Sequence, residues 1–317
     1  MPPRLAPTGA LVLAAGLGTR LRPLTADRAK PALPVAGPTL IERILEGLSL
    51  QGIRDVLLNL HYRPETITGV VGDGSALGLR VRYSWEVPLL GSGGGPRRAF
   101  SLVADDRLWL VNGDTLTDVD LAAMAAEHAS SDALVTMAVI PNPAPERYGG
   151  VVVTPNGAVT AFVPRGWAGP TWHFVGVQIA ERDTFASLAD GVAADSVGPL
   201  YRALIASRPG ALGAFRSDAQ FGDIGTPRDY LDTCLSLAHS PLVAGARVEV
   251  DPSATLEACV LWDDVRVGRG VRLRRVIVGD GVHVPDGYQA DNAVVIGGPG
   301  GLEVTPFVPL QPNGDSH

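Results

Sequence analysis

The sequence predicts an α/β fold with a mostly parallel sheet, followed by a short parallel β-helix. Three observations predict it: apolar runs alternate with helical patterns in the first half of the 317 residues, hydrophobic residues make up 46% of the chain, and apolar residues recur every five or six positions after residue 250. Alternating strands and helices favour a parallel sheet covered on both faces. A period near six is typical of a β-helix.

Two strand ends are the expected site, because ligands of parallel α/β sheets bind beyond the carboxyl ends of the strands. One is LVLAAG and the other is LWLVNGD. The expected strands are 10–14, 55–59, 80–84, 108–111 and 134–140. The expected helices are 39–51, 96–103, 121–128 and one that Thr226 opens as N-cap and that runs to about His239.

The second half of the chain predicts three further parts. A hairpin around Asn156 and the strand WHFVGVQIA predict an antiparallel insert, about 145–180, laid over the site. The expected boundaries are a catalytic domain 1–240, a β-helix 241–297 and a loose tail 298–317. Ordinary hairpins are the alternative to the β-helix. The apolar residues that show the β-helix period are those at 254, 260, 265, 271, 277 and 282.

Composition excludes several function classes. A net charge of −7 argues against a surface that coats nucleic acid. Two cysteines cannot form a disulfide framework and suggest a reducing compartment. The amino terminus lacks the layout of a signal peptide, and no apolar run approaches the roughly 20 residues of a membrane helix. We therefore expect a cytoplasmic protein without membrane or nucleic-acid partners.

A glycine turn follows the first strand. Gly16 and Gly18 allow backbone amides to approach a ligand closely, and consecutive amides form a cradle for anions. Arg20 adds a forked donor suited to phosphate oxygens. The turn is not a P-loop, since no Gly-Lys-Ser/Thr follows, and Leu21 stands where a dinucleotide fingerprint needs a third glycine.

Lys30 is the only lysine, beside 25 arginines (26 Lys and Arg together, less one). The arginine bias is explained by GC-rich coding, so the one retained lysine suggests a need for a compact ammonium. Chance survival of a surface lysine is the alternative.

Residues 11–35, which read LVLAAGLGTRLRPLTADRAKPALPV, resemble the signature of the sugar-1-phosphate nucleotidyltransferases. The family pattern is roughly L-A-A-G-x-G-T-R-L-x-P-L-T followed by P-K-P, and Ala29 replaces the first proline of the second part. Four later stretches also match family motifs, and the six-residue repeats resemble the β-helix that many members append. These stretches are 90–95, 112–114, 147–149 and 222–227.

The resemblance implies a Rossmann-like, three-layer nucleotidyltransferase domain followed by a left-handed β-helix. It implies that a sugar 1-phosphate attacks the α-phosphorus of a nucleoside triphosphate and releases pyrophosphate. The nucleophile is already an anion, so the difficulty is to bring two polyanions together. Positioned cations and Mg²⁺ do most of that work.

The resemblance also implies roles for individual residues. The catalytic residues are Arg20 and Lys30, and Asp114 and Asp223 hold Mg²⁺. The residues at the nucleotide are Leu13, Ala14, Ala15, Gly16, Gly18, Thr19, Gly91, Ser92 and Gly93. The residues at the sugar phosphate are Asn112, Tyr148, Gly149, Arg165 and Gly176.

Some of these roles have alternatives. Glu86, five residues before Gly91, is expected to accept from N1–H and the N2 amine of guanine, or else is only solvated. Asp114 is otherwise a turn former, and Asp223 otherwise only prepares the following helix. Arg165 stands where the family has a lysine, so it either replaces that contact or the contact is lost.

The first expected function is transfer of guanylate from GTP to mannose 1-phosphate or a similar hexose 1-phosphate, in nucleotide-sugar biosynthesis. A uridylyltransferase acting on N-acetylmuramate 1-phosphate or glucose 1-phosphate is the rival. A nucleotide-sugar sensor without turnover, and an acyltransferase built on the repeats, are the alternatives from other classes. The β-helix is expected to mediate a homo-oligomer or to pack against the catalytic domain.

Overall fold

The computed structural model describes residues 6–307, and the chain divides into two compact units. The first, the sheet unit, comprises the chain up to Leu17 and Leu40–Gly222. The second, the β-helix unit, comprises Gly18–Thr39 and the chain from Asp223 onward. We call Gly18–Thr39 the Lys30 segment. The division differs from the expected boundary at residue 240, because the Lys30 segment and the helix before residue 240 pack with the β-helix.

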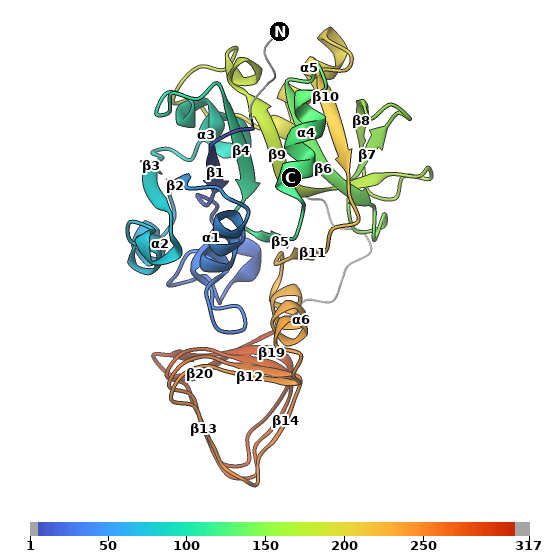
Figure 1. Cartoon of the computed structure of the whole chain (residues 1–317). Helices are drawn as coiled ribbons and strands as arrows, with labels where there is room; N and C mark the ends of the chain where they lie inside the picture. The colour runs from blue at the N-terminus through green and yellow to red at the C-terminus, as the bar shows by residue number, and fades with distance from the viewer. Residues whose placement is uncertain (1–5, 308–317) are drawn as a thin grey trace. The chain divides into compact units, whose positions relative to one another are not determined.

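The sheet unit contains the expected mostly parallel sheet (Figure 1). Within the described residues its strand order is β10-β6-β9-β4-β1-β2-β3, and only β9 runs against its neighbours. The hairpin of β7 and β8 joins it through β9. The strands are β1 Gly9–Leu13, β2 Asp55–Leu60, β3 Arg80–Trp85, β4 Arg107–Asn112, β6 Val135–Pro141, β7 Gly150–Val153, β8 Val159–Val163, β9 Trp172–Glu181 and β10 Leu212–Arg216.

Strand β9 corrects the expected antiparallel insert. Residues 172–181 lie inside the main sheet between β6 and β4, and only the β7–β8 hairpin branches from it. The strand WHFVGVQIA is buried from Val175 to Ala180, because both of its faces are covered. Its antiparallel direction brings its first residues to the carboxyl edge of β4 and β6.

Both faces of the sheet are covered, which confirms the three-layer prediction. Leu11 and Leu110 share one core with Ala99 and Phe100 at the end of α3. Their strand neighbours point to the opposite face and are buried too. The helices of this unit are α1 Leu40–Leu50, α2 Pro64–Val71, α3 Gly91–Ala99, α4 Leu121–Ala129 and α5 Tyr201–Ser207. The short strand β5, Thr115–Thr117, follows β4, and β11, Phe221–Asp223, ends at the unit boundary.

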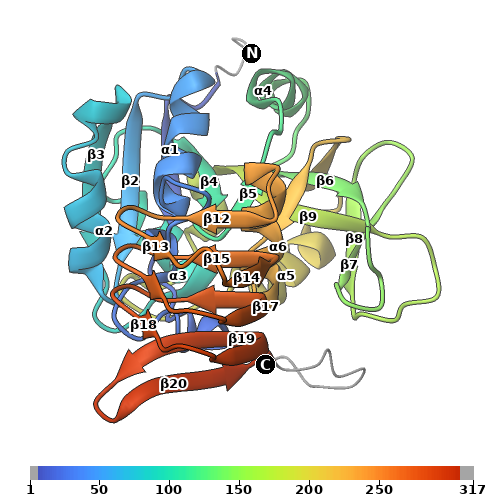
Figure 2. The same ribbon diagram turned by 90° about the horizontal axis from the view of Figure 1, so that it is seen from below.

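The β-helix unit contains parallel strands stacked in rungs (Figure 2). Glu249 pairs with Arg266 and Arg266 with His283, so one turn takes 17 residues. The β-helix prediction is therefore confirmed over ordinary hairpins. The strands are β12 Leu242–Ala244, β13 Glu249–Val250, β14 Thr255–Glu257, β15 Cys259–Leu261, β16 Arg266–Val267, β17 Arg272–Val278, β18 His283–Val284 and β19 Gln289–Gly298.

Two of the periodic apolar residues, Val260 and Ile277, do not belong to the core of the β-helix. Cys259 and Val276 belong to its core, whereas Val260 and Ile277 are buried outside that core. Successive residues of a strand face opposite sides. Here the outer side is buried as well, because α6, Pro227–Ala238, packs against β15 and β17. Periodicity alone does not distinguish two buried faces.

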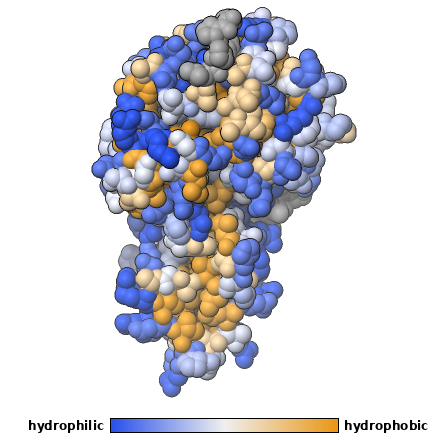
Figure 3. Space-filling model, viewed as in Figure 1, coloured by the Kyte–Doolittle hydropathy of each residue, from blue (hydrophilic) through white to orange (hydrophobic). Residues whose placement is uncertain are grey.

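The last strand of the β-helix unit was not predicted, and its first rung is partly exposed. Residues 301–306 form strand β20, Gly301–Pro306, antiparallel to β19, where a loose tail was expected; residues 308–317 of that tail lie outside the described residues. Figure 3 shows apolar side chains gathered on the β-helix. In the first rung, the side chains of Leu242, Val248 and Ala254 pack against the core of the β-helix but are only partly buried. A homo-oligomer through the β-helix stays a prediction. Within residues 6–307, no helix is long and apolar enough to cross a membrane.

Candidate functional site

The carboxyl edge of β1 and β4 brings several predicted residues together. Gly113 N donates to Leu13 O at 3.0 Å, and a Cβ on Gly113 would lie 2.5 Å from that oxygen. Gly176 on β9 has φ 83°, and its Cβ would lie 2.9 Å from Cβ of Asn112. Both glycines are therefore required by close approach. They fix the start of the glycine turn next to the turn that carries Asp114.

A buried relay of hydrogen bonds connects this edge to the next strands. Ala14 N donates to Asn59 Oδ1 at 2.7 Å, and Asn59 Nδ2 donates to Glu86 Oε1 at 2.7 Å. Glu86 Oε2 accepts from Leu90 N at 2.8 Å. Asn59 is 3% exposed and Glu86 is 1% exposed, so the alternative of a solvated Glu86 is wrong. Asn59 was missed, although a polar residue at the end of a buried strand is a usable signal.

The expected glycine loop is the first part of a helix. Helix α3 begins at Gly91, whereas the sequence predicts a helix only from Pro96. A Cβ at Gly94 would lie 2.5 Å from Val192 O, and one at Gly95 would lie 2.9 Å from Asn59 Nδ2. Ser92 Oγ accepts from Ser196 N at 2.9 Å. Tertiary packing therefore overrides the low helix propensity of glycine here.

The Lys30 segment folds closely upon itself. Gly18 has φ 62°, and a Cβ there would lie 3.3 Å from Cβ of Lys30 and 3.2 Å from Cγ2 of Thr25. Thr25 Oγ1 donates to Gly18 O at 2.8 Å. Lys30 begins a short 3₁₀ helix and is 8% exposed, whereas Arg20 is exposed. The alternative of a surviving surface lysine is therefore wrong.

The two predicted metal ligands each lie at a strand end. Asp114 follows β4, and Asp223 ends β11; both are half-buried. A Cβ at Gly225 would lie 3.0 Å from Asp223 Oδ2, so this glycine leaves room for the carboxylate. Residues 6–307 contain no group of three or more His, Cys, Asp or Glu side chains placed to hold a metal. Mg²⁺ commonly takes only one or two protein carboxylates, so two hard oxygen donors fit it.

The predicted sugar-phosphate residues Tyr148, Gly149 and Arg165 lie around the β7–β8 hairpin. Gly166 N donates to Pro145 O at 2.8 Å, which ties the loop after Arg165 to the loop before Tyr148. Arg165 is exposed.

An aromatic cluster packs beside this loop. The ring of His173 lies 4.5 Å from that of Tyr148 and 4.6 Å from that of Phe221. Burial lowers the pKa of His173 to about 4, so the ring is neutral at pH 7. This agrees with the structural role that is more usual for such a histidine.

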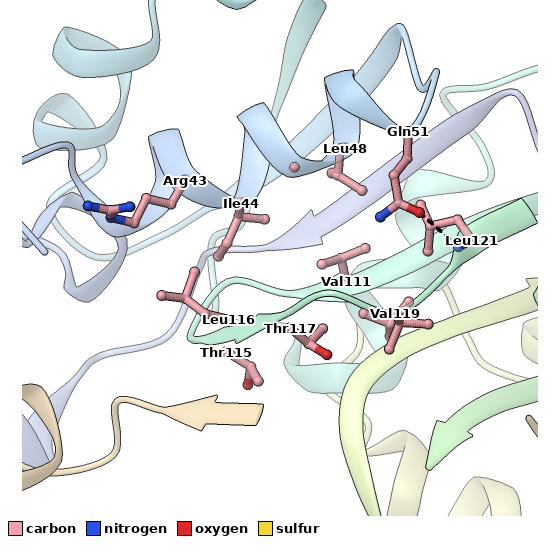
Figure 4. Close-up of a pocket in the computed structure, with 12 residues that line it drawn as sticks. Arg43, Ile44, Leu48, Gln51, Val111, Thr115, Leu116, Thr117, Val119 and Leu121 are labelled. Atoms are coloured by element: carbon pink, nitrogen blue, oxygen red, sulfur yellow. Dashed lines mark hydrogen bonds between the residues drawn. The ribbon is translucent and has the colours of Figure 1, made fainter. Parts of the chain in front are cut away.

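A small pocket lies between α1 and the chain that follows Asp114 (Figure 4). Ile44, Leu48 and Leu116 line it, and its volume is about 60 Å³. A ligand site for a nucleotide needs several hundred Å³. The pocket is too small for one, and none of the predicted site residues lines it.

Comparisons with known proteins agree with this fold. Residues 9–240 match the family model described as nucleotidyl transferase, and residues 236–292 match the GlmU-like C-terminal hexapeptide model. The chain belongs to the sugar-1-phosphate nucleotidyltransferase family.

Three relatives illustrate the range of that family. A mannose-1-phosphate guanylyltransferase of Mycobacterium tuberculosis is 32% identical over 292 residues, which is 88% of this chain and 81% of that protein. An N-acetylmuramate alpha-1-phosphate uridylyltransferase of Neisseria meningitidis is 34% identical over 60% of this chain and 81% of its own. The crystal structure of HddC from Yersinia pseudotuberculosis complexed with GMP-PN is 25% identical with a TM-score of 0.63, covering 73% of this chain and 99% of its own.

Proposed function

We propose that this protein transfers a guanylyl group from GTP to mannose 1-phosphate or a similar hexose 1-phosphate. The observation that carries the reaction class is the buried, sole lysine inside a matched signature. The choice of GTP and mannose is supported by the mycobacterial relative, whose similarity extends over 88% of this chain.

The reaction requires positive charge and correct positioning of the substrates rather than a general base. The sugar phosphate is anionic at neutral pH, so its oxygen attacks without losing a proton. In the proposal, the amides around Gly16 and Gly18 and the guanidinium of Arg20 bind the triphosphate. The Lys30 ammonium, a compact point charge, lies between the α-phosphate and the sugar phosphate, where a planar guanidinium is too broad.

Asp114 and Asp223 are the proposed ligands of Mg²⁺. The ion, when bound, neutralises charge on the phosphates during the transfer. The carboxylates contribute hard oxygen atoms, and the bare Cα atom of Gly225 leaves room for the carboxylate of Asp223.

The base site is proposed to lie near the start of α3, at Gly91, Ser92 and Gly93. Glu86 supports the start of α3, since its two oxygens already accept from Asn59 Nδ2 and Leu90 N. Each carboxylate oxygen keeps a second lone pair. A direct contact of Glu86 with guanine stays a prediction, and so do the proposed sugar contacts of Tyr148, Gly149 and Arg165.

The rival is a uridylyltransferase acting on N-acetylmuramate 1-phosphate or glucose 1-phosphate. It is supported by the relative from Neisseria meningitidis at 34% identity, over a smaller share of this chain. A sensor without turnover is less well supported, because Arg20, Lys30, Asp114 and Asp223 are all present.

A panel of nucleoside triphosphates against sugar 1-phosphates, scored by pyrophosphate release with Mg²⁺, tests the proposal. We expect GTP with mannose 1-phosphate to give the highest kcat/KM. Preference for UTP would select the rival. Binding of a nucleotide sugar with no pyrophosphate from any pair would select the sensor.

A further inference from the structure

Lys30 lies between two points at which its segment is anchored within the β-helix unit. Two residues before it, the guanidinium of Arg28 lies 4.6 Å from the ring centroid of Trp262 and forms an ion pair with Asp280. Trp262 and Asp280 belong to neighbouring turns of the β-helix, since Asp263 N donates to Asp280 Oδ1 at 3.1 Å. The first anchor is therefore made by the β-helix itself.

The second anchor lies four residues after Lys30. Tyr230 on α6 donates its hydroxyl to Pro34 O, and Trp262 Nε1 donates to the same hydroxyl at 2.8 Å. Tyr230 is fully buried and Trp262 is 6% exposed. Burial raises the pKa of the Tyr230 hydroxyl well above its ordinary value, so the group remains a donor. One tryptophan of the β-helix thus contributes to both anchors.

We propose that the β-helix positions Lys30 for catalysis. Asp280 and Trp262 hold the Lys30 segment through Arg28 and Tyr230, so that the Lys30 ammonium contacts both the α-phosphate and the sugar phosphate. This inference rests on the proposed function of Lys30. It assigns a role in the reaction to Asp280 and Trp262, which lie outside the stretches that match the family's motifs. Asp280 and Trp262 are positioning residues, since neither is placed against substrate.

A structure that matches the nucleotidyltransferase part of this chain does not contain the whole β-helix. The HddC structure is matched over 99% of its length by 73% of this chain, so it has no counterpart of the whole β-helix. In this protein, Arg28 connects the Lys30 segment to the β-helix and Pro34 connects it to α6.

The Arg28–Asp280 pair permits a clean test because it is partly exposed, with side chains 29% and 40% accessible. Ion pairs of this kind contribute little to folding stability. Misplacement of a catalytic group by about 1 Å can nevertheless cost on the order of a hundredfold in rate. Loss of the pair is thus expected to change turnover more than stability.

The chain offers a matched control. Asp286 Oδ1 accepts from Arg269 N at 2.8 Å, and its Oδ2 pairs with the Arg269 guanidinium at 2.9 Å. Asp280 likewise accepts a hydrogen bond from a backbone amide of the preceding turn, that of Asp263, and pairs with an arginine. That arginine is Arg28, which belongs to the Lys30 segment. Asp280→Asn and Asp286→Asn therefore remove the same kind of interaction, with and without a link to Lys30.

The experiment uses the full-length protein and two readouts. One is kcat and KM for both substrates. The other is the rate at which Lys30 is acetylated by an amine-reactive ester, followed by peptide mass spectrometry; because Lys30 is the only lysine, the amino terminus is the internal reference. We expect Asp280→Asn to lower kcat by about tenfold with little change in KM, and to speed acetylation about threefold. Asp286→Asn should change neither, and Arg28→Lys should keep more activity than Arg28→Gln.

Three results would overturn the inference. They are equal behaviour of Asp280→Asn and Asp286→Asn, faster acetylation with unchanged kcat, and lower kcat with unchanged acetylation. If the wild-type protein shows no turnover with any substrate pair, the proposed function fails. The acetylation rates then still decide whether the β-helix holds Lys30 in place.

Discussion

Asn59 and Glu86, at the ends of β2 and β3, form a buried hydrogen bond of 2.7 Å between Nδ2 and Oε1. Asn59 also accepts from Ala14 N, and Glu86 also accepts from Leu90 N. The first residues of the glycine turn and the first turn of α3 are thereby held at a fixed separation by two side chains.

Gly95→Ala is expected to destabilise the protein, although alanine favours helices. A Cβ there would lie 2.9 Å from Asn59 Nδ2 and 3.0 Å from Glu86 Oε1, so the relay has to shift. We expect a loss of about 1–3 kcal/mol in urea unfolding and weaker binding of nucleoside triphosphate by calorimetry. Gly69→Ala is the control, since nothing lies within 4 Å of its Cβ; it should gain up to about 1 kcal/mol. Equal gains in both variants would contradict the close approach.

Lys30→Arg is expected to lower kcat by about a hundredfold with unchanged folding stability, because the planar guanidinium displaces one of the two phosphates. Steady-state kinetics and thermal unfolding measure the two quantities. Arg228→Lys, an exposed exchange of the same two residue types, should change neither. Near-normal turnover of the Lys30→Arg variant would defeat the explanation for the lone lysine.

Asp114→Asn and Asp223→Asn are each expected to lower kcat by about a hundredfold or more and to raise the Mg²⁺ concentration needed for half-maximal rate. An amide loses the charge that attracts the ion and keeps the shape of the side chain. Titration of the rate with Mg²⁺ provides the measurement, and Asp132→Asn, at an exposed position, is the control. If Asp223→Asn keeps an unchanged Mg²⁺ requirement, Asp223 only prepares helix α6.

His173 is expected to make stability depend on pH between about 4 and 6.5. Burial lowers its pKa to about 4 in the folded protein, so in this window the unfolded chain binds the proton more tightly. The free energy of unfolding should therefore fall as the pH drops from 6.5 to 4, by about 1–2 kcal/mol for this group after discounting for its partial exposure.

Urea unfolding at several pH values checks this prediction. His173→Phe keeps a ring between Tyr148 and Phe221 and should flatten the decline. His283→Gln, at an exposed histidine of β18, should leave it unchanged. A decline of the same size in His173→Phe would show that other groups cause it.

The parallel strands were predictable because each is a short apolar run that must be buried on both faces. The start of α3 and the place of β9 were not. The helical turn Gly91–Gly95 packs against Val192 O and Asn59, which leave no space for a Cβ at Gly94 or Gly95, and both partners lie far away in the sequence. Strand β9 joins the main sheet through pairing with β4 and β6, and local pattern contains no information on that pairing.

By itself, the sequence determined the family, the parallel sheet, the β-helix and the type of chemistry, because signature residues, strand runs and repeats are local patterns. Only the tertiary structure decided that Glu86 is buried behind α3, that Lys30 is shielded from solvent, and that Arg28 and Pro34 are held by Trp262, Asp280 and Tyr230. These are contacts between residues up to about 250 positions apart. Their energies depend on which surfaces meet after folding.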